Sequence, residues 1–252
     1  NRRMDFLKTM YRFDRHLLII DTETTGLEDH HVICQWGSIL LDRDTLEPSS
    51  KYGTNVLTTP NDLALASPEA MAVHGITEAE LLSPKTAVSI IEVIQQIQKI
   101  HGPSESYHIY GANVHFDWLK LEKTCQRWKV EFPFSTNPPI SCRVFALASY
   151  LHIYGGILGK GWGNCGTRGM CDRYGIQYPQ KHSALGDCEL LTEILQISSR
   201  DLQALVKRNF YSKQPICQCG RLMQLRVGKN ERRFWGCSGF SSGSCKKTKE
   251  LE

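Results

Sequence analysis

An acidic stretch, 21–27, reads Asp-Thr-Glu-Thr-Thr-Gly-Leu and directly follows the four apolar residues 17–20. Residues two apart on a strand share a face, so Asp21 and Glu23 would lie together at the end of a strand. Two carboxylates that close repel each other unless a cation lies between them. The stretch therefore predicts a site for a hard cation such as Mg²⁺ or Mn²⁺. A strand that ends in an ordinary polar turn is the alternative.

A second polar segment, 109–119, reads Ile-Tyr-Gly-Ala-Asn-Val-His-Phe-Asp-Trp-Leu. Its glycine ends a short strand, and a helix is expected over 113–128 because Asn113 is a residue type that caps helix N-termini. Asn113 and Asp117 are four apart and would share one helix face. An amphipathic helix with a solvated Asp117 is the alternative.

A third segment, 181–191, reads Lys-His-Ser-Ala-Leu-Gly-Asp-Cys-Glu-Leu-Leu. Apolar residues spaced three and four apart predict a helix over 183–197. His182 would lie just before this helix and Asp187 within it. A surface histidine with no chemical role is the alternative.

Together, and in this order, the three segments resemble the motifs of the DEDDh group of 3′→5′ exonucleases, which includes the proofreading epsilon subunit, exonuclease X, RNase T and the oligoribonucleases. The resemblance covers residues 14–198. A fourth segment, Val-His-Gly-Ile-Thr at 73–77, is also similar to the family. A glycine that ends one helix and a threonine that caps the next explain it equally well.

The resemblance implies phosphodiester hydrolysis assisted by two Mg²⁺ or Mn²⁺ ions, which lie about 3.5–4 Å apart in such sites. Asp21, Glu23, Asp117 and Asp187 would supply the carboxylates, with Asp21 bridging both ions. His182 would be the general base, because an imidazole pKa of about 6.5 suits proton transfer near neutral pH. Contacts to the terminal nucleotide are expected from Thr24, Leu27, His74, Asn113 and Phe116.

The order of the expected elements predicts an α/β fold. Strands are expected near 16–21, 32–41 and 51–58, helices near 67–73, 77–82 and 86–100, a strand near 107–110, the helix over 113–128, a strand and helix near 140–152, and the last helix near 183–197. An order in which strands come first and helices and strands then alternate fits a ribonuclease H-like mixed sheet with helices on both faces. This fold would form an exonuclease domain over 1–200. The Gly-rich stretch 155–169 is expected to be a loop, either a plain connection or one that touches nucleic acid.

Composition is that of a globular protein, with 41% hydrophobic and 22% charged residues among 252. No apolar run approaches the roughly 20 residues that span a membrane, and the first residues lack an apolar signal core. Scattered cysteines within apolar elements are expected to be buried free thiols, which favours a reducing, cytoplasmic compartment. These are Cys34, Cys125, Cys142 and Cys188, while Cys165 and Cys171 have no evident ligand partners.

A C-terminal module is expected over 215–252, joined through a helical linker over 201–214. So short a segment cannot build a stable core unaided, and its four clustered cysteines predict one structural Zn²⁺. The run Gly-Cys-Ser-Gly-Phe resembles the zinc ribbons at topoisomerase I C-termini, although those open with Cys-x-x-Cys and this chain with Cys-x-Cys. Free thiols or disulfides are the alternative. The expected ligands are Cys217, Cys219, Cys237 and Cys245.

The module carries the positive charge of the chain. Residues 215–252 hold eight Lys or Arg and three Glu, a net charge of +5 in a chain of net charge +4. Cations that track phosphates and aromatic faces that stack on bases are typical of single-strand binding. Arg232, Arg233 and Trp235 are the expected contacts. A solvated basic tail whose aromatic side chains lie in the ribbon core is the alternative.

The resemblances to exonuclease X and to the topoisomerase ribbon favour a 3′→5′ exonuclease acting on DNA, either single strands or 3′ ends, in DNA repair, with release of nucleoside 5′-monophosphates. No motif identifies a reader of the RNA 2′-hydroxyl, so an exoribonuclease on the same fold stays open. A protein in which the ribbon docks a polymerase or repair partner and the nuclease is auxiliary is a further alternative.

Overall fold

The computed structural model describes residues 15–134, 167–206, 215–221, 223–228, 233–239 and 245–250. Contacts between Cα atoms divide the chain into two compact units, 1–199 and 200–252. Several sequence predictions lie outside the described residues: the strand and helix near 140–152, most of the Gly-rich stretch, Cys142, Cys165, Arg232 and the linker residues 207–214.

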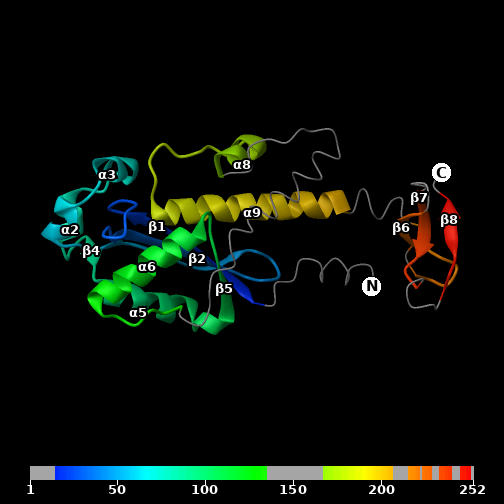
Figure 1. Ribbon diagram of the computed structural model, residues 1–252, viewed down its shortest axis with the longest axis horizontal. Coiled ribbons are helices and arrows are strands. Elements are labelled where there is room, and N and C mark those ends of the chain that lie inside the picture. The colour runs from blue at the N-terminus through cyan, green and yellow to red at the C-terminus, as the bar shows by residue number, and fades with distance from the viewer. Residues whose placement is uncertain are drawn as a thin grey trace. The chain divides into compact units, whose positions relative to one another are not determined.

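A five-stranded mixed sheet forms the centre of the first unit (Figure 1). Its order is β4-β3-β2-β1-β5, where β1 pairs antiparallel with β2 and parallel with β5, and β3 pairs antiparallel with β2 and parallel with β4. This confirms the predicted ribonuclease H-like α/β sheet. The strands are β1 (His16–Thr24), β2 (Ile33–Leu41), β3 (Pro48–Val56), β4 (Ala87–Val88) and β5 (Tyr107–Tyr110).

Helices connect and cover these strands. Thr59, Ser67, Thr77 and Ser89 each cap the helix that follows, since each hydroxyl accepts a backbone N–H from the first turn. The short helix at 60–64 was missed by the sequence analysis, as was the one at 167–174. The helices are α2 (Pro60–Ala64), α3 (Pro68–His74), α4 (Glu78–Leu82), α5 (Ile90–His101), α6 (Val114–Trp128), α8 (Thr167–Tyr174) and α9 (Ala184–Val206), with a 3-10 turn, η1, at Ser104–Ser106.

The helix predicted to begin at residue 86 begins only at Ile90. Residues 87 and 88 instead form β4, where Ala87 pairs with Asn55 and Val88 with Val56. Ser89 then caps the start of α5. Residues 87 and 88, which the helical pattern included, belong to a strand because they pair with β3.

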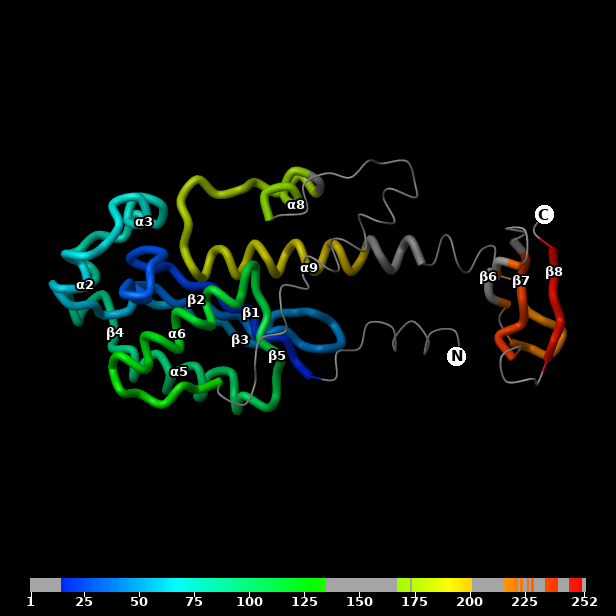
Figure 2. Tube along the Cα trace, viewed as in Figure 1, coloured from blue at the N-terminus to red at the C-terminus, as the bar shows by residue number. Residues whose placement is uncertain are grey.

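Alternation along β1 separates the two faces of the sheet. Leu18 and Ile20 pack in one buried cluster with residues of α5 and α6, whereas Leu17 and Ile19 pack in another with residues of α9. The trace in Figure 2 shows α9 along one side of the strands and α5 along the other. Helices therefore cover both faces, as the sequence predicts.

The start of α9 lies directly on the sheet. A Cβ atom added to Gly37 on β2 would come within 2.2–2.4 Å of backbone atoms of Ala184 and Leu185, and one added to Gly53 on β3 would come within 2.8 Å of the Leu185 side chain. Gly37 pairs in register with both Gly53 and Asp21. Because Gly37 and Gly53 have no side chains, the first turn of α9 can lie against the sheet beside the end of β1.

The second unit contains a three-stranded antiparallel sheet of order β6-β7-β8, formed by β6 (Met223–Val227), β7 (Arg233–Cys237) and β8 (Thr248–Glu250). Its small buried cluster contains Cys217, Met223 and Cys237. Among the described residues, no helix is long and apolar enough to cross a membrane.

Candidate active site

One open cavity of about 220 Å³ collects the polar side chains that the sequence analysis singled out. It lies where the end of β1, the first turns of α6 and the start of α9 meet. Its lining residues are Asp21, Thr22, Glu23, Ala112, Asn113, Phe116, Asp117, Thr167, Tyr178, His182, Asp187 and Leu191. All four predicted carboxylates and the predicted base therefore border a single space, although they come from positions up to 166 residues apart.

Strand β1 places two of the carboxylates. Asp21 and Glu23 continue the face of the strand on which Leu17 and Ile19 meet α9, because side chains alternate along a strand. Register shifts between Glu23 and Thr24, which marks the end of regular pairing with β2. Both carboxylates thus lie at the end of β1, on the side of the sheet that carries α9.

Asp117 reaches β1 from α6 and binds the residue between those two carboxylates. Its Oδ1 accepts hydrogen bonds from the backbone N–H of Thr22 at 2.9 Å and from the Thr22 hydroxyl at 2.7 Å. Both residues are buried. Because β5 pairs with β1 only as far as Ile19, Asp117 occupies the edge of β1 beyond the last strand pair. Both bonds use Oδ1, so Oδ2 remains for a ligand.

The chain between β5 and α6 turns sharply to bring Asp117 there. A Cβ on Gly111 would come within 2.7 Å of the Ile20 carbonyl oxygen, so the turn passes close against β1. Asn113 then adopts a left-handed conformation, with φ of 55°, and its side chain makes no capping hydrogen bond. Asn113 is the N-cap residue of α6, as predicted, but it holds this position in a left-handed backbone conformation that asparagine tolerates, and its side chain lines the cavity.

His182 lies on the segment before α9 and faces Asp187. Its Nδ1 is 3.0 Å from Asp187 Oδ2, its Nε2 is 3.4 Å from the Tyr178 hydroxyl, and its backbone N–H donates to the Val73 carbonyl at 3.3 Å. An ionised Asp187 accepts only, so Nδ1 carries the proton and Nε2 is the basic nitrogen. Tyr178 was missed by the sequence analysis because it lies in an irregular segment where no periodicity points to the cavity.

Burial and mutual repulsion raise the pKa values of the carboxylic acids. Burial first, then the charges of Asp117, Asp187 and Glu23, hold the pKa of Asp21 well above its usual range. Burial, followed by the charges of Asp187 and Asp117, raises the pKa of Glu23 to about 7. Burial raises that of Asp117 to about 7, against the hydrogen bonds from Thr22. Burial also raises the pKa of Asp187, and His182 opposes this shift.

This donor set fits a divalent cation. Glu23, His182 and Asp187 each offer one possible ligand atom, and these three atoms lie within 4.8 Å of one another. Asp21 and Asp117 border the same cavity. The oxygen atoms of these four carboxylates match the ligands that Mg²⁺ and Mn²⁺ prefer, and a bound cation would offset the burial and repulsion that raise their pKa values.

The expected substrate contacts are divided by the structure. Asn113 and Phe116 line the cavity. Thr24 is buried, and its hydroxyl donates to the Gly26 carbonyl at 3.0 Å. Leu27 is 77% exposed on the loop that follows β1. His74 is buried, with Nδ1 accepting from the Ile76 N–H at 3.1 Å and Nε2 lying 3.6 Å from Cys34 Sγ. Substrate contact by these residues stays a prediction.

The loop that carries Leu27 is held by one basic stripe on α6. Lys120 donates to the Glu28 carbonyl, Lys123 pairs with Asp29, and Arg127 donates to the His30 carbonyl. The buried ammonium of Lys120 also lies 5.4 Å from the centre of the Phe116 ring. These contacts tie the exposed loop to the helix that carries Asp117.

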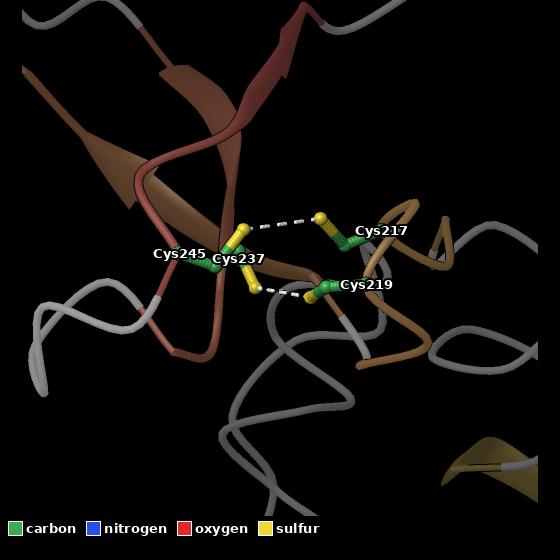
Figure 3. A group of neighbouring side chains, drawn as sticks. All are labelled: Cys217, Cys219, Cys237 and Cys245. Carbon is green, nitrogen blue, oxygen red and sulfur yellow. Dashed lines mark hydrogen bonds between the residues drawn. The ribbon is translucent and has the colours of Figure 1, made fainter.

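In the second unit, all four predicted zinc ligands come together (Figure 3). Cys217 Sγ is 3.6 Å from Cys245 Sγ, and Cys219 Sγ is 3.4 Å from Cys237 Sγ. A disulfide needs about 2.05 Å, whereas sulfurs around a tetrahedral zinc with bonds of about 2.3 Å lie about 3.8 Å apart. The Cys-x-Cys opening therefore still brings Cys217 into the group, helped by a turn that ends at Gly220 with φ of 80°.

Hydrogen bonding favours the thiolate that zinc requires at one of the four cysteines, Cys219. A backbone hydrogen bond from Arg221, and then one from the Cys237 thiol, lower the pKa of Cys219 to about 7. At Cys237 a backbone hydrogen bond acts in the same direction, but burial and hydrogen bonds to the other cysteines outweigh it and raise the pKa to about 12. Trp235, an expected nucleic-acid contact, is half-buried and packs against the cysteine group. Arg233 begins β7. The structure thus gives Trp235 a place in the ribbon core, as the alternative foresaw, with part of its surface exposed.

We expect the metal-free protein to lose stability as pH rises from about 5 to 8. The unfolded chain releases these carboxyl protons at a pKa of about 4, whereas folded Glu23 and Asp117 keep theirs to about 7. The folded state binds more protons in this window, so the free energy of unfolding falls as pH rises through it. Mg²⁺ or Mn²⁺ relieves the repulsion and should raise the unfolding temperature more at pH 8 than at pH 5.5.

Differential scanning fluorimetry measures both effects. Asp117→Asn keeps an oxygen that can accept from Thr22 while removing one charge. This variant should be more stable than the unsubstituted chain at pH 8 without metal, and should gain less from added metal. An equal metal-induced shift at both pH values would contradict the expected linkage.

We also expect about one zinc ion per chain. A site of four thiolates supplies folding free energy to a short segment, so Cys217→Ser should lower the bound zinc by about half or more. Elemental analysis of the purified protein measures this. Cys171→Ala, at a buried thiol of the first unit, is the matched control and should leave the zinc content unchanged. Zinc that persists in the Cys217 variant would remove this residue from the ligand set.

Comparisons with known proteins agree with this geometry. An exonuclease family model, RNase_T, matches residues 18–195. The comparison with curated protein sequences found no match. The nuclease domain of 3′hExo, a DEDDh family member bound to rAMP, is 20% identical, with 75% of this chain and 92% of that chain covered and a TM-score of 0.55.

Two further solved structures share the fold. A 3′-exonuclease described with 3′-end specific recognition of histone mRNA stem-loop is 17% identical, covering 95% of this chain and 96% of that chain with a TM-score of 0.54. E. coli exonuclease I in complex with a dT13 oligonucleotide is 15% identical, covering 89% of this chain and 52% of that chain with a TM-score of 0.59. The family model spans well over half of the chain, and the chain therefore belongs to the RNase_T exonuclease family.

Proposed function

We propose that this exonuclease is a metal-dependent enzyme that shortens DNA from the 3′ end and releases nucleoside 5′-monophosphates. The observation that carries the proposal is the meeting of Asp21, Glu23, Asp117, Asp187 and His182 around one open cavity. Carboxylates gathered around one cavity bind hard divalent cations, and the adjacent imidazole supplies a base.

In the proposed reaction, the carboxylates of Asp21, Glu23, Asp117 and Asp187 would hold two Mg²⁺ or Mn²⁺ ions. Bound divalent ions supply Lewis acidity toward the phosphate and the attacking water. His182 takes the proton of that water through Nε2, because Nδ1 keeps its own proton and donates a hydrogen bond to Asp187, which orients the ring. The Tyr178 hydroxyl lies 3.4 Å from Nε2 and borders the same cavity, so it can donate to this nitrogen until water replaces it.

The terminal nucleotide would occupy the part of the cavity next to α6. Phe116 offers an aromatic face there and Asn113 a polar side chain. Leu27 projects from the anchored loop after β1, and an exposed aliphatic side chain on a fixed loop can pack against a base. These contacts would position the last phosphodiester bond over the carboxylates.

We further propose that the zinc-binding unit tethers the enzyme to nucleic acid. Its net charge of +5 and its partly exposed aromatic side chain favour contact with phosphates and bases. A tether would raise the local concentration of substrate at the nuclease and favour repeated cleavage of one strand. A ribbon that docks a polymerase or another repair protein is the competing proposal.

Digestion of matched 5′-labelled single-stranded DNA and RNA with Mg²⁺ or Mn²⁺ tests the activity. We expect a ladder that shortens from the 3′ end of DNA, and a fall of at least about 10³-fold in rate for Asp21→Ala, because removing one carboxylate disrupts the metal site. Lys51→Ala, at an exposed ion pair with Glu189, is the control and should leave the rate unchanged. A ladder mainly on RNA would make the enzyme an exoribonuclease, and cleavage of neither would favour the docking proposal.

Deletion of residues 215–252 tests the tether. We expect weaker binding to a long single strand and a shallower dependence of affinity on salt, because cationic contacts to phosphates are lost. Turnover of a small nucleotide ester that offers no strand to bind, such as thymidine 5′-monophosphate p-nitrophenyl ester, reports whether the nuclease unit is intact and should not change. Unchanged affinity for the long strand would favour a protein partner for the ribbon.

A further inference from the structure

A row of polar side chains crosses the sheet beside the carboxylates. Glu23 on β1 pairs in register with Gln35 on β2, which pairs with Asn55 on β3. The Gln35 Nε2 donates to Asn55 Oδ1 at 2.8 Å, and the Gln35 Oε1 accepts from the backbone N–H of Ala184 at 2.8 Å. A backbone N–H can only donate, so this bond determines which way the amide of Gln35 faces.

Ala184 is the first residue of α9, and a backbone N–H at that position has no acceptor within its own helix. The hydroxyl of Ser183 accepts from Gly186 at 3.3 Å, one turn further on. Gln35 thus accepts a hydrogen bond from the Ala184 N–H, which has no acceptor within the helix. The bond joins the middle of the sheet to a point two residues after His182 and three before Asp187.

Packing alone allows this close approach but does not set the position of the helix along the strand. Because Gly37 has no side chain, the backbone of Ala184 and Leu185 can approach β2 closely. Van der Waals contact of this kind has no preferred direction. A hydrogen bond does have one, since it weakens steeply away from linearity. Gln35 is therefore the directional contact between β2 and the start of α9.

We propose that Gln35 is a positioning residue for hydrolysis, which acts through Ala184 to place His182 and Asp187 against the β1 carboxylates. The proposal rests on the proposed nuclease function. Misplacement of a reacting group by about 1 Å can cost about 10²-fold in rate, so a contact that anchors both groups at once affects turnover without touching substrate.

The test compares three variants of the full chain. Gln35→Met has similar length but can neither accept from Ala184 nor donate to Asn55. Gln35→Glu restores an acceptor for Ala184. Asn55→Leu removes the partner on β3 and leaves the acceptor of Gln35 in place. Each is measured for kcat and KM on 5′-labelled single-stranded DNA, and for hydrogen exchange of the Ala184 amide by nuclear magnetic resonance.

For Gln35→Met we expect kcat to fall about 10- to 100-fold with KM within about 3-fold, and exchange of the Ala184 amide to quicken at least about 10-fold. Gln35→Glu adds a negative charge beside Glu23, so only its effect on exchange is interpreted: it should restore slow exchange of the Ala184 amide. Asn55→Leu should change kcat and exchange least. Unchanged kcat with unchanged exchange in Gln35→Met overturns the proposal, and so does a loss of kcat without faster exchange, or fast exchange that Gln35→Glu fails to slow.

Hydrogen exchange needs no turnover, and this separates the two hypotheses. If the unsubstituted chain does not cleave DNA, the proposed function fails. Faster exchange at Ala184 in Gln35→Met, together with a reduced Mn²⁺-induced rise in unfolding temperature, then still supports the placement of Asp187 by Gln35. Unchanged exchange and an unchanged rise overturn that placement.

Discussion

The close approach of α9 to β2 is the constraint on which the cavity depends. Any side chain larger than hydrogen at Gly37 would overlap the backbone of Ala184, so the helix can reach the sheet only where a glycine stands opposite Asp21. Because Asp187 lies on the first turn of that helix, this contact sets the distance between the carboxylates of β1 and α9. Gln35 adds direction to the same contact through its bond with Ala184.

The protein concentrates like charge where the rest of the fold excludes water. Burial raises the pKa values of Glu23 and Asp117 to about 7 and raises those of Asp21 and Asp187 as well, so the apoprotein keeps protons that exposed carboxylic acids would lose. A divalent cation would replace those protons, and the carboxylates would bind the cation instead of repelling one another. The small second unit follows a related principle, since its core consists largely of cysteines that a zinc ion would hold together.

Periodicity and local signals predicted much of the fold of the first unit. An apolar run located β1, the capping residue Asn113 located the start of α6, and helical spacing of apolar residues located the start of α9. The two-residue strand β4 was missed because only its pairing with β3 makes it a strand. Asn113 is the N-cap of α6, as the sequence predicted, but its backbone is left-handed and its side chain makes no capping hydrogen bond.

The sequence by itself determined which side chains are the candidates for catalysis and metal binding. Acidic residues two apart after an apolar strand predict a hard divalent cation, and cysteines gathered in a short basic segment predict zinc, because of the charge and softness of their ligand atoms. Only the tertiary structure decided which partners orient them. Thr22 binds Asp117, Tyr178 lies against His182 and Gln35 holds Ala184 because distant segments meet there. Such pairings depend on register and packing across the sheet, which no local pattern encodes.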